Sequence, residues 1–217
     1  MTTARSDRGH RIFAAFYDWA TTRRESGRPD ERRERLVGDL VGNVLEVGIG
    51  NGLNLGYYRR LTSLTAVEPD RFMRRQLERR AAAATFPFEV IAGEAEALPF
   101  PAGSFDAVVT SLVLCSVRDP AQALSEIGRV LKPGREYRFL EHVRGEGLGG
   151  MALDVVRPIW SFAAGGCQPN RRTEATIRLT GLSIVSLERY REGLLPHILG
   201  IAVSPANAVP SNSTRES

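Results

Sequence analysis

The chain has 217 residues, of which 42% are hydrophobic and 25% charged, with a formal net charge of +4, a composition typical of one soluble globular domain. Its 29 basic residues are all arginine except Lys132 and are interleaved with carboxylates, which predicts a mixed, solvated surface rather than a nucleic-acid site. No apolar run approaches the ~20 residues of a membrane span and the N-terminus has no signal-peptide core, so we expect a cytoplasmic protein that is not attached to a membrane.

The first 41 residues are predicted to form an N-terminal helical cap. Between residues 8 and 25, apolar and aromatic side chains recur at near-helical spacing, namely Ile12, Phe13, Phe16, Tyr17 and Trp19. This helix either packs on the core or acts as a lid that covers a pocket and excludes water, and the two interpretations are compatible. A second, highly charged helix is predicted over residues 30–41.

A short apolar strand, 43–47, is followed by glycines at positions 48, 50 and 52. Glycine suits a turn at which a ligand approaches the backbone closely. The dinucleotide pattern G-x-G-x-x-G fails because its last position is Leu53, and no Gly-Lys-Ser/Thr follows to make a phosphate loop. Glu46, two residues before the first glycine, suits a ligand with a cationic end. We expect a helix from Leu53 to Arg60 after this loop.

The next two strands are predicted over 64–68 and 88–92. The first ends at Glu68, with Pro69-Asp70 opening a helix through Ala84. About 20 residues beyond the first glycine, the Glu68 carboxylate can accept hydrogen bonds from both ribose hydroxyls of an adenosine; the alternative is a solvated helix-capping charge. After the second strand, Glu94 can accept the amino group of adenine while the backbone of Ala95 reads the edge of the ring.

The remaining elements continue the alternation of strands and helices. We expect a strand over 104–112, a helix from Asp119-Pro120 to Val130 that ends at Lys132-Pro133-Gly134, and a strand over 136–143. Four strand–helix units in series predict a parallel sheet with right-handed crossovers. Further expectations are helices at 152–160 and 173–180, strands at 182–190 and 197–204, a single domain over 1–205, and a disordered tail over 206–217.

Four motifs in this order carry a family resemblance: Glu46-x-Gly48-x-Gly50-x-Gly52, Glu68-Pro69, Gly93-Glu94-Ala95-Glu96 and Leu131-Lys132-Pro133-Gly134. Together they resemble the class I S-adenosylmethionine-dependent methyltransferases. The resemblance implies a Rossmann-like, doubly wound α/β fold whose seven-stranded sheet is mostly parallel, with helices on both faces and the last strand antiparallel between the fifth and sixth. The cofactor would be S-adenosylmethionine. Its expected binding residues are Glu46, Gly48, Ile49, Gly50, Asn51, Gly52, Asn54, Glu68, Pro69, Gly93, Glu94, Ala95, Ser111 and Leu112.

A narrower resemblance rests on four later segments, in which the chain is similar to the methyltransferase-like thiol S-methyltransferases. These segments are 111–117, Glu141-His142-Val143, Gly166-Cys167 with Arg171 and Thr173, and 196–203. The chain departs from that family in three respects: it lacks the apolar N-terminal anchor of the animal members, Arg135 replaces a second glycine, and the sequence at 168–170 differs. The last departure falls where the acceptor is expected, so substrate identity stays open.

Methyl transfer is an in-line displacement, so the chain mainly has to align the acceptor and exclude water. A thiol needs little further help, whereas an oxygen or nitrogen acceptor would want a base. His142 is the candidate catalytic base, with a structural role as its alternative, and the expected acceptor-binding residues are Tyr17, His142, Trp160 and Asn170.

Cys115 is interpreted as a buried apolar residue. The two cysteines and three histidines show no paired ligand spacing, so no metal site is predicted.

The leading hypothesis is a methyltransferase for a small-molecule thiol. One alternative is O-, N- or C-methylation in secondary metabolism or lipid-quinone synthesis. The other is a catalytically silent cofactor-binding regulatory module, against which the intact Glu46, Glu68 and glycines argue. A nucleic-acid methyltransferase would want a base-flipping motif after the fourth strand, where this chain reads Thr110-Ser111-Leu112-Val113.

Overall fold

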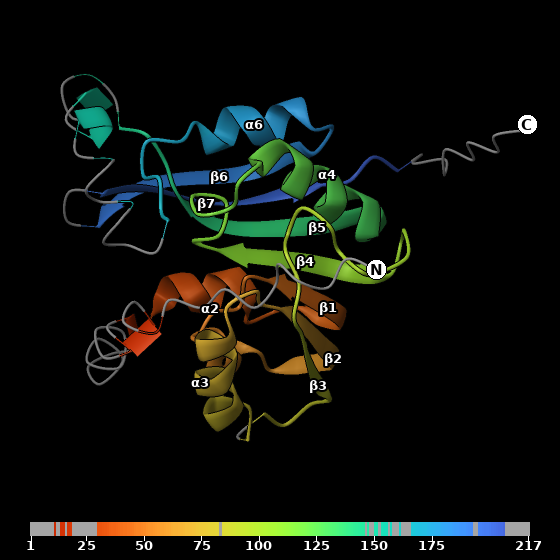
Figure 1. Ribbon diagram of the computed structural model, residues 1–217. Coiled ribbons are helices and arrows are strands. Elements are labelled where there is room, and N and C mark those ends of the chain that lie inside the picture. Colours follow the sequence, from red (N-terminus) through yellow and green to blue (C-terminus); the bar gives the residue numbers. More distant parts are fainter. Residues whose placement is uncertain are drawn as a thin grey trace, which may run out of the picture.

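The computed structural model describes residues 30–206, except for residues 83, 146, 148, 149, 152, 156, 158–160, 162–165, 193 and 194, and it also describes residues 11, 14, 15, 17 and 18. Seven strands form one sheet in the order β3-β2-β1-β4-β5-β7-β6 (Figure 1). The strands are β1 (Val41–Val47), β2 (Arg60–Val67), β3 (Phe88–Ile91), β4 (Phe105–Ser111), β5 (Leu131–His142), β6 (Ser183–Glu192) and β7 (Leu195–Val203). The helices are α2 (Glu31–Val37), the 3₁₀ turn η1 (Leu55–Tyr57), α3 (Arg71–Ala81), α4 (Pro120–Val130) and α6 (Thr173–Leu179).

The sheet is parallel except at its last strand. β1 pairs in parallel with β2 on one side and β4 on the other. β2 also pairs in parallel with β3, and β4 pairs in parallel with β5. β7 lies between β5 and β6 and runs antiparallel to both. The predicted seven-stranded, mostly parallel sheet is therefore confirmed, including the insertion of the last strand. The first reversal of strand order lies between β1 and β4, where open α/β sheets bind their ligands at the carboxyl edge.

Helices cover both faces of the sheet because side chains alternate between two cores. One core joins Leu45, Val108 and Phe139 to Leu124 of α4 and Ile177 of α6. The other joins the intervening strand positions, such as Val44 and Val109, to Leu36 of α2 and Leu77 of α3. In Figure 1, α4 and α6 lie together against the β5–β7 half, while α3 lies beside β1–β3. The helix α2 packs on β5 and β7 from the face opposite α4 and α6. This two-sided burial explains the nearly continuous apolar runs of the central strands.

Two local predictions are wrong. The helix expected from Leu53 to Arg60 is only the short turn η1, because Gly52 and Gly56 lower helix propensity around it and Gly52 adopts a φ of 86°. Lys132-Pro133-Gly134 does not follow the end of a helix as a loop but lies inside β5. There the register slips from Phe105 opposite Leu131 to Ala107 opposite Glu136, and this irregularity accommodates the proline.

Some predictions fall on residues that the structure does not describe. Ile12, Phe13, Phe16, Trp19 and Trp160 lie outside the described residues, as do positions 207–217. The described residues at the N-terminus, Arg11, Ala14, Ala15, Tyr17 and Asp18, are helical. Across the described part of the chain, no helix combines the length and apolar character needed to cross a membrane.

Candidate functional site

The glycine loop follows β1 at the carboxyl edge of the sheet, and its three glycines all have positive φ, at 68°, 61° and 86°. A Cβ on Gly48 would lie 2.6 Å from Val113, and one on Gly52 would lie 2.6 Å from Leu77. These two positions are therefore restricted by packing as well as by conformation. A Cβ on Gly50 would meet nothing within 4 Å, so the middle of the loop borders open space that a ligand can enter.

Glu68 lies directly beside this open space. Its Oε2 accepts the Gly50 N–H at 2.8 Å and its Oε1 accepts the Asp70 N–H at 2.9 Å. The side chain that caps α3 is Asp70, whose carboxylate accepts from Phe72 at 2.7 Å. Burial raises the pKa of Glu68 to about 7. Glu68 is thus a buried acid held against the loop and not a solvated capping charge, which suits a ribose-binding role.

Glu46 lies deeper, at the end of β1, and is 1% exposed. Its oxygens accept from Asn54 Nδ2 at 2.6 Å and from the Tyr58 hydroxyl at 2.8 Å. Arg33 of α2 donates to Asn54 Oδ1 at 2.6 Å. Burial raises the pKa of Glu46 to about 7. The sequence indicated Glu46 and Asn54 but missed Tyr58 and Arg33, which complete this network between α2 and the loop.

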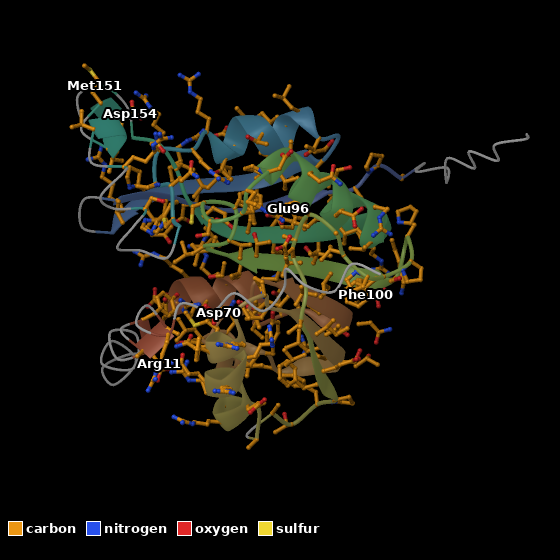
Figure 2. All side chains as sticks on the ribbon, in the orientation of Figure 1. Arg11, Asp70, Glu96, Phe100, Met151 and Asp154 are labelled. Atoms are coloured by element: carbon orange, nitrogen blue, oxygen red, sulfur yellow. The ribbon has the colours of Figure 1, made fainter. Side chains whose placement is uncertain are left out.

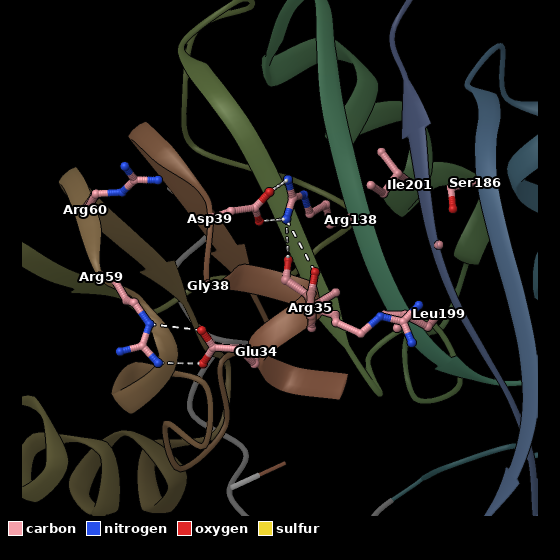
Figure 3. Close-up of a pocket in the computed structure, with 12 residues that line it drawn as sticks. Glu34, Arg35, Gly38, Asp39, Arg59, Arg60, Arg138, Ser186, Leu199 and Ile201 are labelled. Atoms are coloured by element: carbon pink, nitrogen blue, oxygen red, sulfur yellow. Dashed lines mark hydrogen bonds and ion pairs between the residues drawn. The ribbon is translucent and has the colours of Figure 1, made fainter. Parts of the chain in front are cut away.

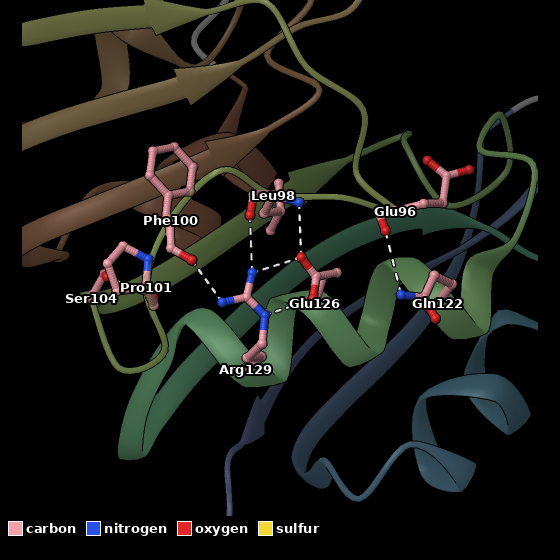
Figure 4. A network of polar contacts seen from close by, with 8 residues as sticks. All are labelled: Glu96, Leu98, Phe100, Pro101, Ser104, Gln122, Glu126 and Arg129. Carbon is pink, nitrogen blue, oxygen red and sulfur yellow. Dashed lines mark hydrogen bonds and ion pairs between the residues drawn. The ribbon is translucent and has the colours of Figure 1, made fainter. Parts of the chain in front are cut away.

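The segment after β3 holds Gly93, Glu94 and Ala95 beside β2. The Glu94 carboxylate forms an ion pair with Arg118, so it would reach an adenine amino group only while sharing or opening that pair. Downstream, α4 fixes this segment, as Figure 4 shows. Arg129 donates to the carbonyls of Leu98 and Phe100, and Glu126 accepts the Leu98 N–H at 2.9 Å.

Two of the described N-terminal residues, Ala14 and Asp18, contact α3 and the glycine loop. Asn51 Nδ2 donates to Asp18 Oδ1 at 3.0 Å, and Gln76 of α3 donates to the Ala14 carbonyl at 3.0 Å. These two residues therefore lie on the α3 side of the loop, the side on which Figure 2 labels Arg11. Burial raises the pKa of Tyr17, and the charges of Glu68 and Cys115 add to that effect. The Tyr17 hydroxyl accordingly lies near both the candidate ribose acid and the residues that follow β4.

The chain turns sharply where β4 ends. Leu112 has a φ of 60°, the only positive value of a non-glycine residue within the described chain, and such backbone strain is frequent at functional sites. Glu141 of β5 holds the turn, because its carboxylate accepts the N–H groups of Val113 at 3.1 Å and Leu114 at 3.0 Å. Burial raises the pKa of Glu141 to about 7. Ser111 and Leu112 therefore lie beside Gly48, whose neighbour is Val113.

His142, the last residue of β5, lies against both cysteines. Its Nδ1 is 3.4 Å from Cys167 Sγ. Single ligand atoms of Cys115, His142 and Cys167 all lie within 4.8 Å of one another. Hydrogen bonding to Cys167 and burial raise the pKa of the Cys115 thiol. Cys115 is buried as predicted, but the structure places it in a polar cluster, which sequence spacing did not indicate.

Asn170 does not join this cluster directly. Its Nδ2 donates to Asp154 Oδ1 at 2.9 Å, and Asp154 also pairs with Arg144 at 2.7 Å. Figure 2 shows Asp154 and Met151 on a helical segment at the edge of the molecule. Among the predicted acceptor residues, the structure thus brings His142 to the carboxyl edge and Tyr17 to the same neighbourhood, and leaves Asn170 on a more exposed contact.

A cavity of about 670 Å³ lies elsewhere, near the amino ends of β1 and β2 (Figure 3). Its charged side chains are largely paired with each other: Arg59 with Glu34, and Arg138 with Asp39. Because the glycine loop follows the carboxyl end of β1, this cavity belongs to the opposite edge of the sheet and is not the candidate cofactor site.

Comparisons with known proteins agree with this architecture. A model of the family described as "Methyltransferase domain" matches residues 45–138. Human thiol S-methyltransferase TMT1B is 33% identical over 172 residues, 74% of this chain and 70% of that protein. Demethylmenaquinone methyltransferase of Renibacterium salmoninarum is 39% identical over 109 residues, 48% of this chain and 44% of that protein.

A solved structure has the same fold at low sequence identity. Geranyl diphosphate C-methyltransferase of Streptomyces coelicolor, in a complex that contains S-adenosyl-L-homocysteine, superposes with a TM-score of 0.63 at 15% identity, covering 80% of this chain and 76% of that one. Three observations lead to one conclusion. They are the order of the strands, the glycine loop beside an acid at the end of β2, and the 33% identity to human TMT1B over most of both chains. The chain belongs to the class I S-adenosylmethionine-dependent methyltransferases, with S-adenosylmethionine as its cofactor, and it is a relative of the thiol S-methyltransferases.

Proposed function

We propose that this enzyme methylates a small-molecule thiol. The main support for the proposal is the share of this chain that aligns with each relative. Human TMT1B aligns with 74% of the chain, whereas the demethylmenaquinone methyltransferase aligns with 48%. The longer similarity exceeds the 94 residues of the matched domain (45–138) and must include chain outside the cofactor half, where the acceptor residues are expected. The relatives whose names indicate nitrogen or carbon acceptors match a smaller part of the chain, 48–59%.

The residues of the carboxyl edge suit the proposed cofactor. Glu68 would accept the ribose hydroxyls, since its carboxylate borders the open space at Gly50 and retains lone pairs beyond its two backbone contacts. Glu46 would face the cationic amino acid end through its network with Asn54. Other proposed contacts are Gly48, Ile49, Asn51, Gly52, Pro69, Gly93, Glu94, Ala95, Ser111 and Leu112. When bound, the cofactor supplies an electrophilic methyl group on a sulfonium sulfur.

The remaining contribution of the chain is to place the acceptor and exclude water. The turn at Leu112, fixed by Glu141, and the last residue of β5, His142, border the side from which an acceptor would approach. A thiol is already a few per cent ionised near neutral pH, so it needs alignment more than a base. An oxygen or nitrogen acceptor would depend on proton removal by His142. A cytoplasmic setting is part of the proposal, supported by Cys115 and Cys167 both being free thiols.

The N-terminal 41 residues are proposed to cap this site as part of a single domain over 1–205. The contacts of Asp18 with Asn51 and of Ala14 with Gln76 support this role, because they join the segment to the cofactor loop and to the helix beside it. Tyr17 would then form a wall of the acceptor pocket.

The proposal is tested by incubating the purified chain with methyl-labelled S-adenosylmethionine and a panel of alkyl thiols, phenols, amines and a demethylmenaquinone. We expect label in methyl thioethers. Label in the phenol, amine or quinone products, with none in the thiols, would refute the thiol assignment while leaving the family intact. Label in none of them, with the cofactor bound, would favour the regulatory-module alternative.

A further inference from the structure

Three potential ligand atoms for a metal meet where β4, β5 and the 166–171 segment converge. Cys115, His142 and Cys167 come from three separate segments, yet their ligand atoms lie within 4.8 Å of one another. We propose that these three side chains bind a thiophilic divalent cation, Zn²⁺, and that the fourth coordination position takes the acceptor thiol as a thiolate. The second half of this proposal rests on the proposed function.

The spacing of the three atoms fits tetrahedral zinc. With Zn–S bonds near 2.3 Å and Zn–N bonds near 2.0 Å, neighbouring ligand atoms are separated by about 3.5–3.8 Å. Cys167 Sγ and His142 Nδ1 are 3.4 Å apart, and no pair exceeds 4.8 Å. Closing the cluster around a metal therefore requires side-chain shifts of about 1 Å and no rearrangement of the backbone.

The backbone around the cluster is fixed by contacts that do not involve its ligand atoms. The Gln168 N–H donates to the Cys115 carbonyl at 2.7 Å. Arg171 donates to the carbonyls of Leu114 and Val117, at 2.6 Å each. The Thr173 hydroxyl donates to the His142 carbonyl at 3.3 Å. Three segments that are distant in sequence are thus held together before any metal binds.

The imidazole of His142 is also oriented. Its ring packs on His197, with centroids 4.4 Å apart, and His197 stacks on Tyr190 at 5.0 Å. His197 itself is fixed by an Nδ1–H donated to the Leu195 carbonyl at 2.9 Å. This stack keeps Nδ1 of His142 directed into the cluster, 3.4 Å from Cys167 Sγ. As a ligand, Nδ1 would be the deprotonated nitrogen and the proton would be on Nε2.

The kind and number of donors favour a reactive zinc site over a closed structural one. Two thiolates and one imidazole select zinc over Mg²⁺ or Ca²⁺, which prefer oxygen. Three protein ligands leave one position open, as in catalytic zinc sites. With two thiolates the Zn²⁺ centre is neutral, and a third thiolate would give one negative charge, which the neighbouring Arg171 guanidinium would offset. Cys115 Sγ lies 3.4 Å from the Leu112 carbonyl, and the next residue, Val113, packs on Gly48, which puts the cluster near the cofactor loop.

The open position gives the thiol acceptor a defined chemistry. On binding the metal, the thiol loses its proton to solvent. A lone pair of the metal-bound thiolate then forms the new sulfur–carbon bond, while the old bond from the methyl carbon to the sulfonium breaks and leaves its electron pair on the cofactor sulfur. The product is a neutral thioether, a weak ligand, and it leaves the metal so that the next thiol can bind.

Co²⁺ is the probe for this site, because its absorption spectrum depends on the number and kind of its ligands. The purified full-length chain, stripped with chelator under reducing conditions, is titrated with Co²⁺. We expect one equivalent to bind with intense red-region bands of tetrahedral cobalt and a sulfur-to-cobalt charge-transfer band. Zn²⁺ should displace it. Absence of binding, or the weak spectrum of octahedral cobalt, would overturn the proposal.

Variants test which residues bind. Cys115→Ser, Cys167→Ser and His142→Asn should each weaken cobalt binding at least 100-fold. Thr176→Ala is the control, since its hydroxyl lies on α6, donates to the Arg172 carbonyl at 3.3 Å and offers no ligand to the proposed site, and it should leave binding unchanged. The thermal shift caused by S-adenosylmethionine confirms that each variant is folded. If thiol titration shows that Cys115 and Cys167 form a disulfide in the purified chain and cobalt binds only weakly after reduction, the pair is a redox pair and the metal proposal is wrong.

A last experiment distinguishes a failure of the metal proposal from a failure of the proposed thiol methylation. Adding ethanethiol to the cobalt form should intensify the charge-transfer band, as a third thiolate joins the metal. Thiol methylation that is equally fast with the metal removed would refute the role of zinc and leave the thiol function standing. Cobalt binding without any thiol methylation would leave the metal site standing and refute the thiol function.

Discussion

At the scale of single residues, Glu68 is the most direct test of the cofactor site. Glu68→Ala removes the carboxylate that borders the open space at Gly50 and leaves the Gly50 and Asp70 N–H groups without their acceptor. Saturating S-adenosylmethionine at about 100 times its Kd should stabilise the parent chain by about 2.7 kcal/mol, seen as a rise in Tm. We expect this rise to be largely lost in Glu68→Ala and retained in Glu89→Ala, an exposed carboxylate on the neighbouring strand.

His142 gives a second residue-scale prediction, in which the pH dependence distinguishes its possible roles. If His142 holds a metal, His142→Ala should lower kcat/KM for a thiol by at least about 100-fold, and raising the pH should not restore it. If His142 is instead a general base, the activity should recover as the pH approaches the pKa of the thiol. His197→Phe, which keeps an aromatic ring against His142, should cost much less. Rates measured from pH 6 to 10 distinguish the two roles.

How much of the site could be predicted depends on how far its residues are separated along the chain. Glu46, Gly50 and Glu68 could be found because a strand, its turn and the next strand have nearly fixed spacing. Cys115, His142 and Cys167 could not, because the chain between His142 and Cys167, which are 25 residues apart, is not a strand–helix–strand unit of fixed spacing, and the three residues meet only in the folded chain. Tyr58 was missed for a different reason: a helix was predicted where the chain forms the turn η1, and this turn directs Tyr58 to Glu46.

At the scale of elements, the N-terminal segment should contribute to cofactor affinity. Asp18→Ala removes the acceptor of Asn51 Nδ2 and the charge partner of Arg80. Losing one such partly buried hydrogen bond costs about 1 kcal/mol, so the Kd for S-adenosylmethionine measured by calorimetry should rise about fivefold. Glu188→Ala, which breaks an exposed pair with Arg35, is the control and should not change the Kd. Equal affinities in all three proteins would show that the segment does not cap the cofactor.

Helices and strands could be predicted where burial sets the pattern of apolar residues. They were predicted less well where turn-forming residues occur. The strands had apolar runs because helices cover both faces, so their positions were correct to within a few residues. The start of β5 was not, because Lys132-Pro133-Gly134 has the composition of a loop and yet is absorbed in a register slip against β4. The antiparallel insertion of β7 followed from the family resemblance and not from the residues of β7, since periodicity does not encode strand order.

At the scale of the whole molecule, three buried acids make stability depend on pH. Glu46, Glu68 and Glu141 are at most 6% exposed, all lie at the carboxyl edge, and burial raises the pKa of each from 4.5 to about 7. Between these two pH values the folded chain holds protons that the unfolded chain has lost, so the free energy of unfolding falls as the pH rises. Each group contributes at most about 3.5 kcal/mol to this fall, at about 1.4 kcal/mol per pH unit.

We therefore expect the cofactor-free chain to be more stable to urea near pH 5.5 than near pH 8. Asp106, whose pKa is lowered by Lys132, acts in the opposite sense, but only as the pH falls through values below its ordinary pKa of 3.8. Glu46→Gln should reduce the fall between pH 5.5 and 8, because an amide keeps the contacts with Asn54 and Tyr58 without a titrating proton. If the variant and the parent lose the same stability over this range, Glu46 ionises alike in the folded and unfolded chains. Burial of Glu46 would then impose no cost in stability at neutral pH.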